Sequence, residues 1–201
     1  MGHQNPRVVG IVAFDDMEVL DYAGPYEVFN VAEEIAGAGY RVESLSLRPG
    51  HVVARGGFTV VPDRQIDDGP MPDIVVVPGG AGTRRLLGDE SLRDWLSRAA
   101  SEAEVVASVC SGALLLGAAN LLADRPATTH HDAFDELTAV SATTEVVTDQ
   151  RFVHAGENVW TAGGISAGVD LSLHLVELLS GGDAKRAVVE EMEWGWHTPA
   201  S

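Results

Sequence analysis

Cysteine and lysine are almost absent from this chain of 201 residues. Cys110 is the only cysteine and Lys185 is the only lysine. A single cysteine excludes an internal disulfide, which is consistent with a reducing compartment. The 13 basic residues are outnumbered by 30 acidic ones, which gives a net charge of −17. Because nucleic-acid binding needs a basic surface to neutralise phosphates, we expect no nucleic-acid partner.

The chain also contains no apolar run long enough to cross a membrane. Its most apolar stretch, residues 114–122, is about half the length that a membrane helix needs and is interrupted by Gly117 and Asn120. Residues 1–6 lack the charged and then apolar pattern of a secretion signal. Pro6 also stands where an N-myristoylation motif needs Ser or Thr. We therefore expect one cytoplasmic domain over residues 1–201, with no membrane association.

Short β-branched apolar runs alternate with segments that have helical apolar periodicity. Strands are expected at residues 7–14, 41–47, 73–77 and 104–109, with hairpins over residues 51–61 and 151–161. Helices are expected at residues 18–36, 90–103, 111–122, 168–179 and 183–193, with Val19, Leu20, Val28, Val31 and Ile35 of the first one facing inward. This alternation predicts a three-layer α/β sandwich, with helices on both faces of a parallel sheet.

Cys110 lies where a predicted strand meets a predicted helix. In open parallel sheets the ligand site lies beyond the carboxyl ends of the central strands, and Phe14, Val77 and Val109 all end strands there. A tight strand-to-helix turn projects its apical side chain into the cleft, and the start of the helix favours a thiolate. A small buried core cysteine is the alternative. The position favours a nucleophile.

Two further features are expected at the same edge of the sheet. The glycine-rich turn at residues 78–82 allows backbone N–H groups, with that of Ser111, to stabilise developing negative charge. Asp21 precedes Pro25, which is expected to kink the helix, and has apolar neighbours that would keep its carboxyl protonated. Four other acids compete with it for this role: Asp15, Asp16, Glu18 and Glu27.

These motifs resemble those of the ThiJ/PfpI superfamily, and most closely its isonitrile hydratase branch. The resemblance spans nearly the whole chain and rests on LDYAGPYEVF (20–29), VVPGGAGT (76–83), SVCSGALLLGAANLL (108–122), RPATTHH (125–131) and TAGGISAGVDLSLHLVE (161–177). It implies a flavodoxin-like sandwich, a homodimer and chemistry without a cofactor. It also implies that Cys110 is the nucleophile, Asp21 its acidic partner and Ser111 a further catalytic residue. The candidate oxyanion- and substrate-binding residues are Gly79, Gly80, His130 and Ile165.

Departures from the superfamily pattern narrow the expected chemistry. Protease-like members have His after the cysteine, whereas this chain has Ser111, so peptidase activity is not expected. Hydratases often carry Thr there and use Asp as the acid, as this chain does at Asp21. His131 replaces a Trp that is common in hydratases, which leaves the shape of the pocket open. Related transcription regulators carry an additional helix-turn-helix domain, which we do not expect here.

The predicted function is hydration of an isonitrile to an N-substituted formamide through a thioimidate on Cys110. A cofactor-free glyoxalase, a redox or stress sensor and a ligand-binding regulatory domain remain alternatives. His130 is equally compatible with a structural and a catalytic role. His154, His174, Trp194 and Trp196 are expected to pack or to lie at the surface, and no spacing predicts a metal site. The substrate is expected to be a small molecule whose side chain the sequence leaves open.

Overall fold

The computed structural model describes residues 5–195, and a seven-stranded sheet forms its centre. The strand order is β10-β11-β7-β6-β1-β2-β5, and every neighbouring pair is parallel except β10 with β11. These strands are β1 (Arg7–Ala13), β2 (Tyr40–Ser46), β5 (Arg64–Gln65), β6 (Ile74–Val77), β7 (Val105–Val109), β10 (Phe152–Gly156) and β11 (Val159–Ala162).

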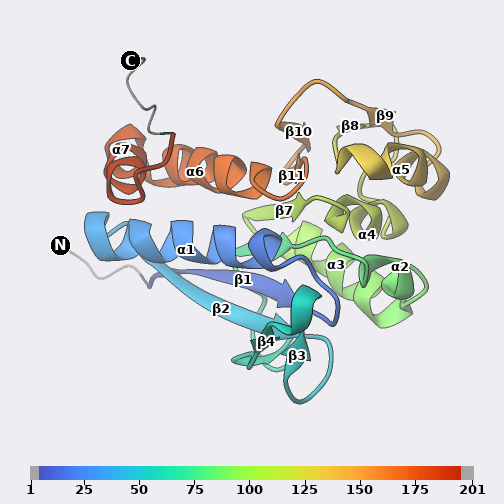
Figure 1. The fold of residues 1–201 in the computed structure, drawn as a ribbon, viewed down its shortest axis with the longest axis horizontal. Helices are drawn as coiled ribbons and strands as arrows, with labels where there is room; N and C mark the ends of the chain where they lie inside the picture. Colours follow the sequence, from blue (N-terminus) through green and yellow to red (C-terminus); the bar gives the residue numbers. More distant parts are fainter. Residues whose placement is uncertain (1–4, 196–201) are drawn as a thin grey trace.

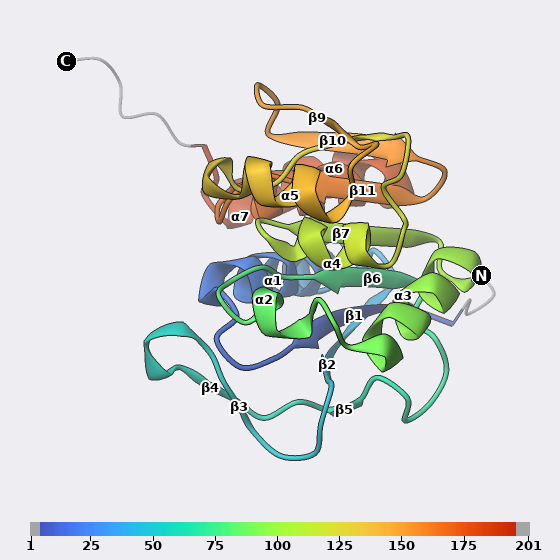
Figure 2. The same cartoon turned by 90° about the vertical axis from the view of Figure 1, so that its right-hand side faces the viewer.

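Helices cover both faces of this sheet (Figures 1 and 2). On one face α1 (Val19–Ala36) packs against α6 (Ala167–Ser180) and α7 (Gly182–Glu191). On the other face α3 (Glu90–Glu102) contacts α4 (Gly112–Ala118), and both contact β7. The predicted α/β/α sandwich with a mostly parallel sheet is confirmed.

The central strands are buried over their whole length. All residues of β6 and β7 are buried, as expected for strands with helices on both sides. Each fully buried Val contributes about 1.5–3 kcal/mol relative to an exposed one. The core therefore holds β1, β6 and β7 firmly, and their carboxyl ends lie side by side because the strands are parallel neighbours.

Several local expectations differ from the structure. Helix α4 is shorter than predicted and ends at Ala118, and the chain then turns through Asn120 in the left-handed conformation (φ 60°). Helix α1 continues through Pro25 as one helix. Leu20 and Ile35 were expected to face inward, but 39% and 46% of their surfaces are exposed. For Leu20 and Ile35 the prediction was wrong, because the buried face of α1 lies elsewhere on the helix.

Short elements escaped the sequence patterns. They are β5, α2 (Thr83–Leu86), α5 (Phe134–Val140), β8 (Pro126–Ala127), β9 (Glu145–Val146) and two 3-10 turns, Arg55–Gly57 and His131–Ala133. The predicted hairpin around Gly56 is confirmed as β3 (Val52–Val53) paired with β4 (Thr59–Val60). Among residues 5–195, no helix combines the length and the apolar character needed to span a bilayer.

Candidate active site

Cys110 occupies the turn between β7 and α4, in a backbone conformation that few non-glycine residues adopt. Its φ is 57°, in the left-handed region that costs a side-chain-bearing residue about 1–3 kcal/mol. Its amide donates to the carbonyls of Ala162 (3.1 Å) and Gly163 (3.0 Å). Its own carbonyl accepts a hydrogen bond from the Thr129 hydroxyl (2.7 Å). These bonds hold the strained turn and fix the direction of the thiol.

Gly79 connects Cys110 to Asp21. Its amide donates to Oδ2 of Asp21 at 3.0 Å. A Cβ atom at this position would lie 2.5 Å from the Ser111 nitrogen and 2.8 Å from the Cys110 Cβ. The turn after β6 can approach the cysteine this closely only because residue 79 has no side chain.

Asp21 is fully buried in α1, and burial raises the pKa of its carboxyl from 3.8 to about 7. The hydrogen bond from Gly79 opposes this rise but does not overcome it. The other oxygen, Oδ1, has no hydrogen bond of ordinary geometry among the described residues. The Cys110 thiol and the Ile165 amide are nevertheless close enough to affect the pKa of this carboxyl. Burial therefore acts in the direction expected from the apolar neighbours of Asp21.

The thiol of Cys110 has a raised pKa, contrary to the sequence-based expectation. Burial and then the negative charge of Asp21 raise this pKa from 9.0 to about 12, while the Ser111 and Ile165 amides oppose the rise. Burial and the charge of Asp21 therefore oppose the effect of the start of α4 on the thiol. Because the charge of Asp21 raises the pKa of the Cys110 thiol, the protonation of one group depends on that of the other.

The Ser111 hydroxyl is hydrogen-bonded within the protein. This buried hydroxyl accepts from the Gly80 amide (3.0 Å) and lies 3.2 Å from the Gly80 carbonyl and 3.3 Å from the Thr83 hydroxyl. The Gly79 and Gly80 amides are thus both engaged within the protein. The predicted role of these amides in stabilising negative charge on a substrate stays a prediction, and Asp21 and Ser111 accept their hydrogen bonds in this structure. The amides that favour charge on the sulfur are those of Ser111 and Ile165.

A cavity of about 480 Å³ opens above Cys110. Its lining includes Ser111, His130 and Ile165, together with Arg55 and Arg84, which sequence reasoning missed. The two arginines form ion pairs, Arg55 with Glu18 at 2.5 Å and Arg84 with Glu136 at 2.6 Å. Their charges are therefore largely balanced, and the cavity suits a neutral ligand.

The β3–β4 hairpin brings Arg55 to the site by a tertiary contact. The Arg55 amide donates to the Met17 carbonyl at 2.9 Å, which fixes the hairpin over the segment before α1. The sequence gives no signal for this approach. Arg84 lies only two residues after the glycine turn at residues 78–82. This closeness in sequence is the one signal that could have placed Arg84 at the site.

His130 lies in the wall of the cavity, next to Ile165. Its Nδ1 accepts a hydrogen bond from the Asp132 amide (3.2 Å), so the neutral ring carries its proton on Nε2. The ring packs on Gly164, where a Cβ would lie 2.1 Å from the His130 Cδ2. His130, His131 and Asp132 each place one ligand atom within 4.8 Å of the others, which is compatible with a metal ion. His131 and Asp132 are exposed, and the three residues are consecutive in the chain, so the geometry gives no reason to assign a metal ion here.

The remaining sequence candidates lie away from the cavity. The exposed His154 stacks on Trp160, with ring centroids 4.3 Å apart, and burial lowers the pKa of His174, which packs on the same tryptophan. The indole of Trp194 donates to Asp170 at 2.9 Å. These packing roles are the predicted ones. Trp196 lies outside the described residues.

An enzyme and a transcriptional regulator are similar to this chain over most of its length. It is 35% identical over 189 residues to the isonitrile hydratase of Pseudomonas putida, covering 92% of this chain and 78% of that protein. It is 28% identical to the HTH-type transcriptional regulator GbdR of Pseudomonas aeruginosa, covering 94% of this chain and 51% of GbdR. The chain thus spans most of the hydratase but only about half of the regulator.

Solved structures share the whole fold. A THiJ/PfpI family protein from Pseudomonas syringae superposes with a TM-score of 0.83 at 25% identity, covering 98% of this chain and 78% of that one. Drosophila melanogaster DJ-1beta gives 0.81 at 20% identity, covering 95% of this chain and all of that one. The model of the DJ-1/PfpI family matches residues 7–178. The chain therefore belongs to the DJ-1/PfpI family.

Proposed function

We propose that this protein is a lyase that hydrates a small, neutral isonitrile to an N-substituted formamide. The observation that carries the proposal is a buried carboxyl with a pKa of about 7 beside the only thiol of the chain. The pair faces a cavity whose two arginines are neutralised by ion pairs. The 35% identity to an isonitrile hydratase supports the same reaction.

The first step adds the Cys110 S–H bond across the terminal carbon of the isonitrile. The sulfur forms a bond to that carbon while the ionised Asp21 accepts the thiol proton and passes it to the same carbon. The product is a thioimidate, in which the carbon bears one hydrogen and is doubly bonded to nitrogen. The Ser111 and Ile165 amides stabilise negative charge on sulfur as the proton leaves.

The second step restores the free thiol. A water molecule adds to the thioimidate carbon, and its protons pass to the substrate nitrogen and to Asp21. The carbon–sulfur bond then breaks, the formamide leaves and Asp21 returns a proton to Cys110. The carboxyl serves as base and acid in turn, a role suited to a group with a pKa near neutrality.

Two alternatives would use the same residues. A redox sensor would use the Cys110 thiol, and the site itself offers no feature that favours it over turnover. A cofactor-free glyoxalase would use the same thiol and carboxyl, and the site itself offers no feature that favours it. We further propose that the protein is a cytoplasmic homodimer that acts without a cofactor.

The proposal is tested by supplying the protein with a simple aromatic isonitrile and, separately, with methylglyoxal. Formamide should form from the isonitrile, and Cys110→Ala and Asp21→Asn should each abolish or strongly reduce it. Asp16→Asn is the matched control, since Asp16 lines the same cavity with an exposed side chain. Conversion of methylglyoxal alone would replace the hydratase assignment with the glyoxalase one.

A further inference from the structure

Arg48 differs from every other basic residue in the part of the chain that the structure describes. The 13 lysine and arginine side chains all lie within residues 5–195, and 12 of them form an ion pair with an acidic side chain. Arg48, which is exposed, has no such pair and no side-chain hydrogen bond there. Its guanidinium is therefore free to pair with an anionic ligand.

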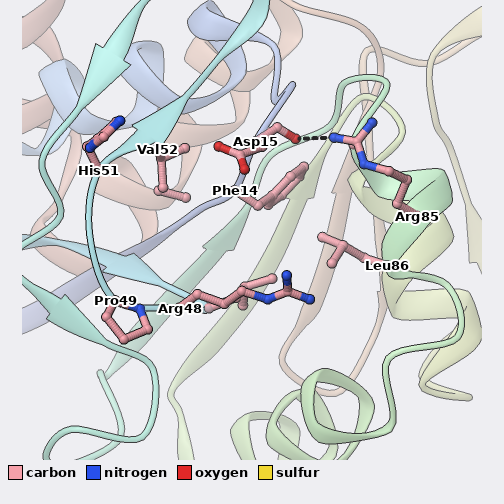
Figure 3. Close-up of a pocket in the computed structure, with 11 residues that line it drawn as sticks. Phe14, Asp15, Arg48, Pro49, His51, Val52, Arg85 and Leu86 are labelled. Atoms are coloured by element: carbon pink, nitrogen blue, oxygen red, sulfur yellow. Dashed lines mark hydrogen bonds between the residues drawn. The ribbon is translucent and has the colours of Figure 1, made fainter.

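Arg48 lines a second cavity, of about 320 Å³, at the carboxyl ends of β1 and β2. This volume is within the range of small-molecule sites. Figure 3 shows the Arg48 side chain reaching into the same space as Phe14 and Leu86. The nearly buried Phe14 and Val52 form apolar walls. The cavity thus combines one unpaired cation with apolar surfaces that can hold a ring or a branched chain.

The other charged groups of this cavity restrict the charge of the ligand. Arg85 is already used, because its guanidinium donates to the Asp15 carbonyl (3.1 Å) and the Asp16 carboxylate (2.8 Å). The Asp15 carboxylate accepts from the Val53 amide (2.8 Å) and lies across Phe14 from Arg48 in Figure 3. His51 adds an imidazole ring to the lining. One free cation opposite one carboxylate favours a single negative charge over two.

From this arrangement we propose that the cavity is a second ligand site, which binds a small monocarboxylate with an aromatic or branched apolar body. The carboxylate pairs with the Arg48 guanidinium, whose fork of N–H groups matches it. The apolar body lies on Phe14, Leu86 and Val52. A phosphate dianion is disfavoured by the Asp15 carboxylate, and a neutral analogue makes no ion pair.

The site is separate from the Cys110 cavity, although one contact joins them. Cys110 does not line the second cavity, and Arg48 does not line the first. Arg85 lines the second cavity and binds Asp16, which lines the first. Binding of a carboxylate is therefore expected not to require Cys110.

Isothermal titration calorimetry at pH 8 with phenylacetate tests the proposal. Phenylacetate should bind the wild-type protein, with phenylacetamide and phenyl phosphate binding at least about tenfold more weakly. Arg48→Gln should weaken phenylacetate binding by about tenfold or more. Arg93→Gln is the matched control, because it also removes one positive charge but lies on α3, away from the cavity. It should leave binding unchanged.

Two further variants locate the bound ligand. Cys110→Ala should bind phenylacetate as well as the wild type does, and Leu86→Trp should block binding by filling the cavity while circular dichroism shows a retained fold. The proposal is overturned if the wild type does not bind phenylacetate at millimolar concentration, or if Arg48→Gln binds it equally well. Loss of binding in Cys110→Ala would also overturn it, since the anion would then occupy the Cys110 cavity.

Discussion

Asp21→Asn should stabilise the folded protein at pH 8 while it removes most of the activity. The folded state raises the carboxyl pKa from 3.8 to about 7, so ionising this group in the folded protein costs about 4 kcal/mol. Because the folded pKa exceeds the unfolded one, the stability that Asp21 confers below pH 3.8 is lost as pH rises to about 7. Asn keeps an oxygen to accept the Gly79 amide but does not ionise.

The assay for this prediction is urea unfolding of both proteins at pH 4 and pH 8. The variant should exceed the wild type by about 4 kcal/mol at pH 8 and by less than about 1 kcal/mol at pH 4. Asp16→Asn, which changes an exposed carboxylate, should shift stability by less than about 1 kcal/mol at either pH. Equal stability of Asp21→Asn and the wild type at pH 8 would refute the claim that ionising the buried Asp21 carboxyl costs folding free energy.

The same variant separates the catalytic role of Asp21 from an effect on the thiol. Removing the negative charge should lower the pKa of Cys110, so iodoacetamide should alkylate the thiol faster at pH 8 than in the wild type. Hydration should nevertheless fall by about a hundredfold or more, because Asn cannot transfer the proton to carbon. Formamide released at the wild-type rate would end the candidacy of Asp21, and Asp16 or Glu18 would then need testing.

The remaining predictions concern the thiol, the turn, the pH profile and the assembly. Cys110→Ala should abolish turnover while unfolding shows a loss of only about 1 kcal/mol; a loss of several would indicate a packing role instead. Gly79→Ala should reduce both activity and stability, because its Cβ would lie 2.5 Å from the Ser111 nitrogen; an active, stable variant would contradict the close approach. The kcat/KM for hydration should rise with pH through about 7, as Asp21 ionises, and a flat profile from pH 6 to 9 would exclude Asp21 as the base. Light scattering should give the mass of a homodimer, consistent with exposed Leu20 and Ile35 on α1, and a monomer at low and high salt would contradict it.

The sequence predicts the fold because its signals are local. Runs of β-branched apolar residues mark β1, β6 and β7, and each is buried where the pattern requires. The position of Cys110 follows from the boundary between strand and helix alone. Burial of Asp21 follows from its apolar neighbours, and the resulting rise in its pKa has the predicted direction.

The details of the site could not be predicted because they depend on contacts between distant segments. The Gly80 amide donates to the Ser111 hydroxyl, 31 positions away. Arg55 reaches the cavity only because its hairpin is bonded to Met17. The high pKa of Cys110 results from burial and from the charge of Asp21. Together these two effects outweigh the lowering of the pKa by the amide at the start of α4, which was the only effect visible in the sequence.

The most direct test of the central claim is the mass of the Cys110 peptide during turnover. Wild-type protein is mixed with a simple aromatic isonitrile, quenched with acid at successive times and digested for mass spectrometry. The mechanism predicts that this peptide transiently gains the mass of the whole isonitrile, as a thioimidate on sulfur, and returns to its original mass as the substrate is consumed. Steady production of formamide with an unmodified Cys110 peptide at every time, matched by equal production in Cys110→Ala, would contradict it.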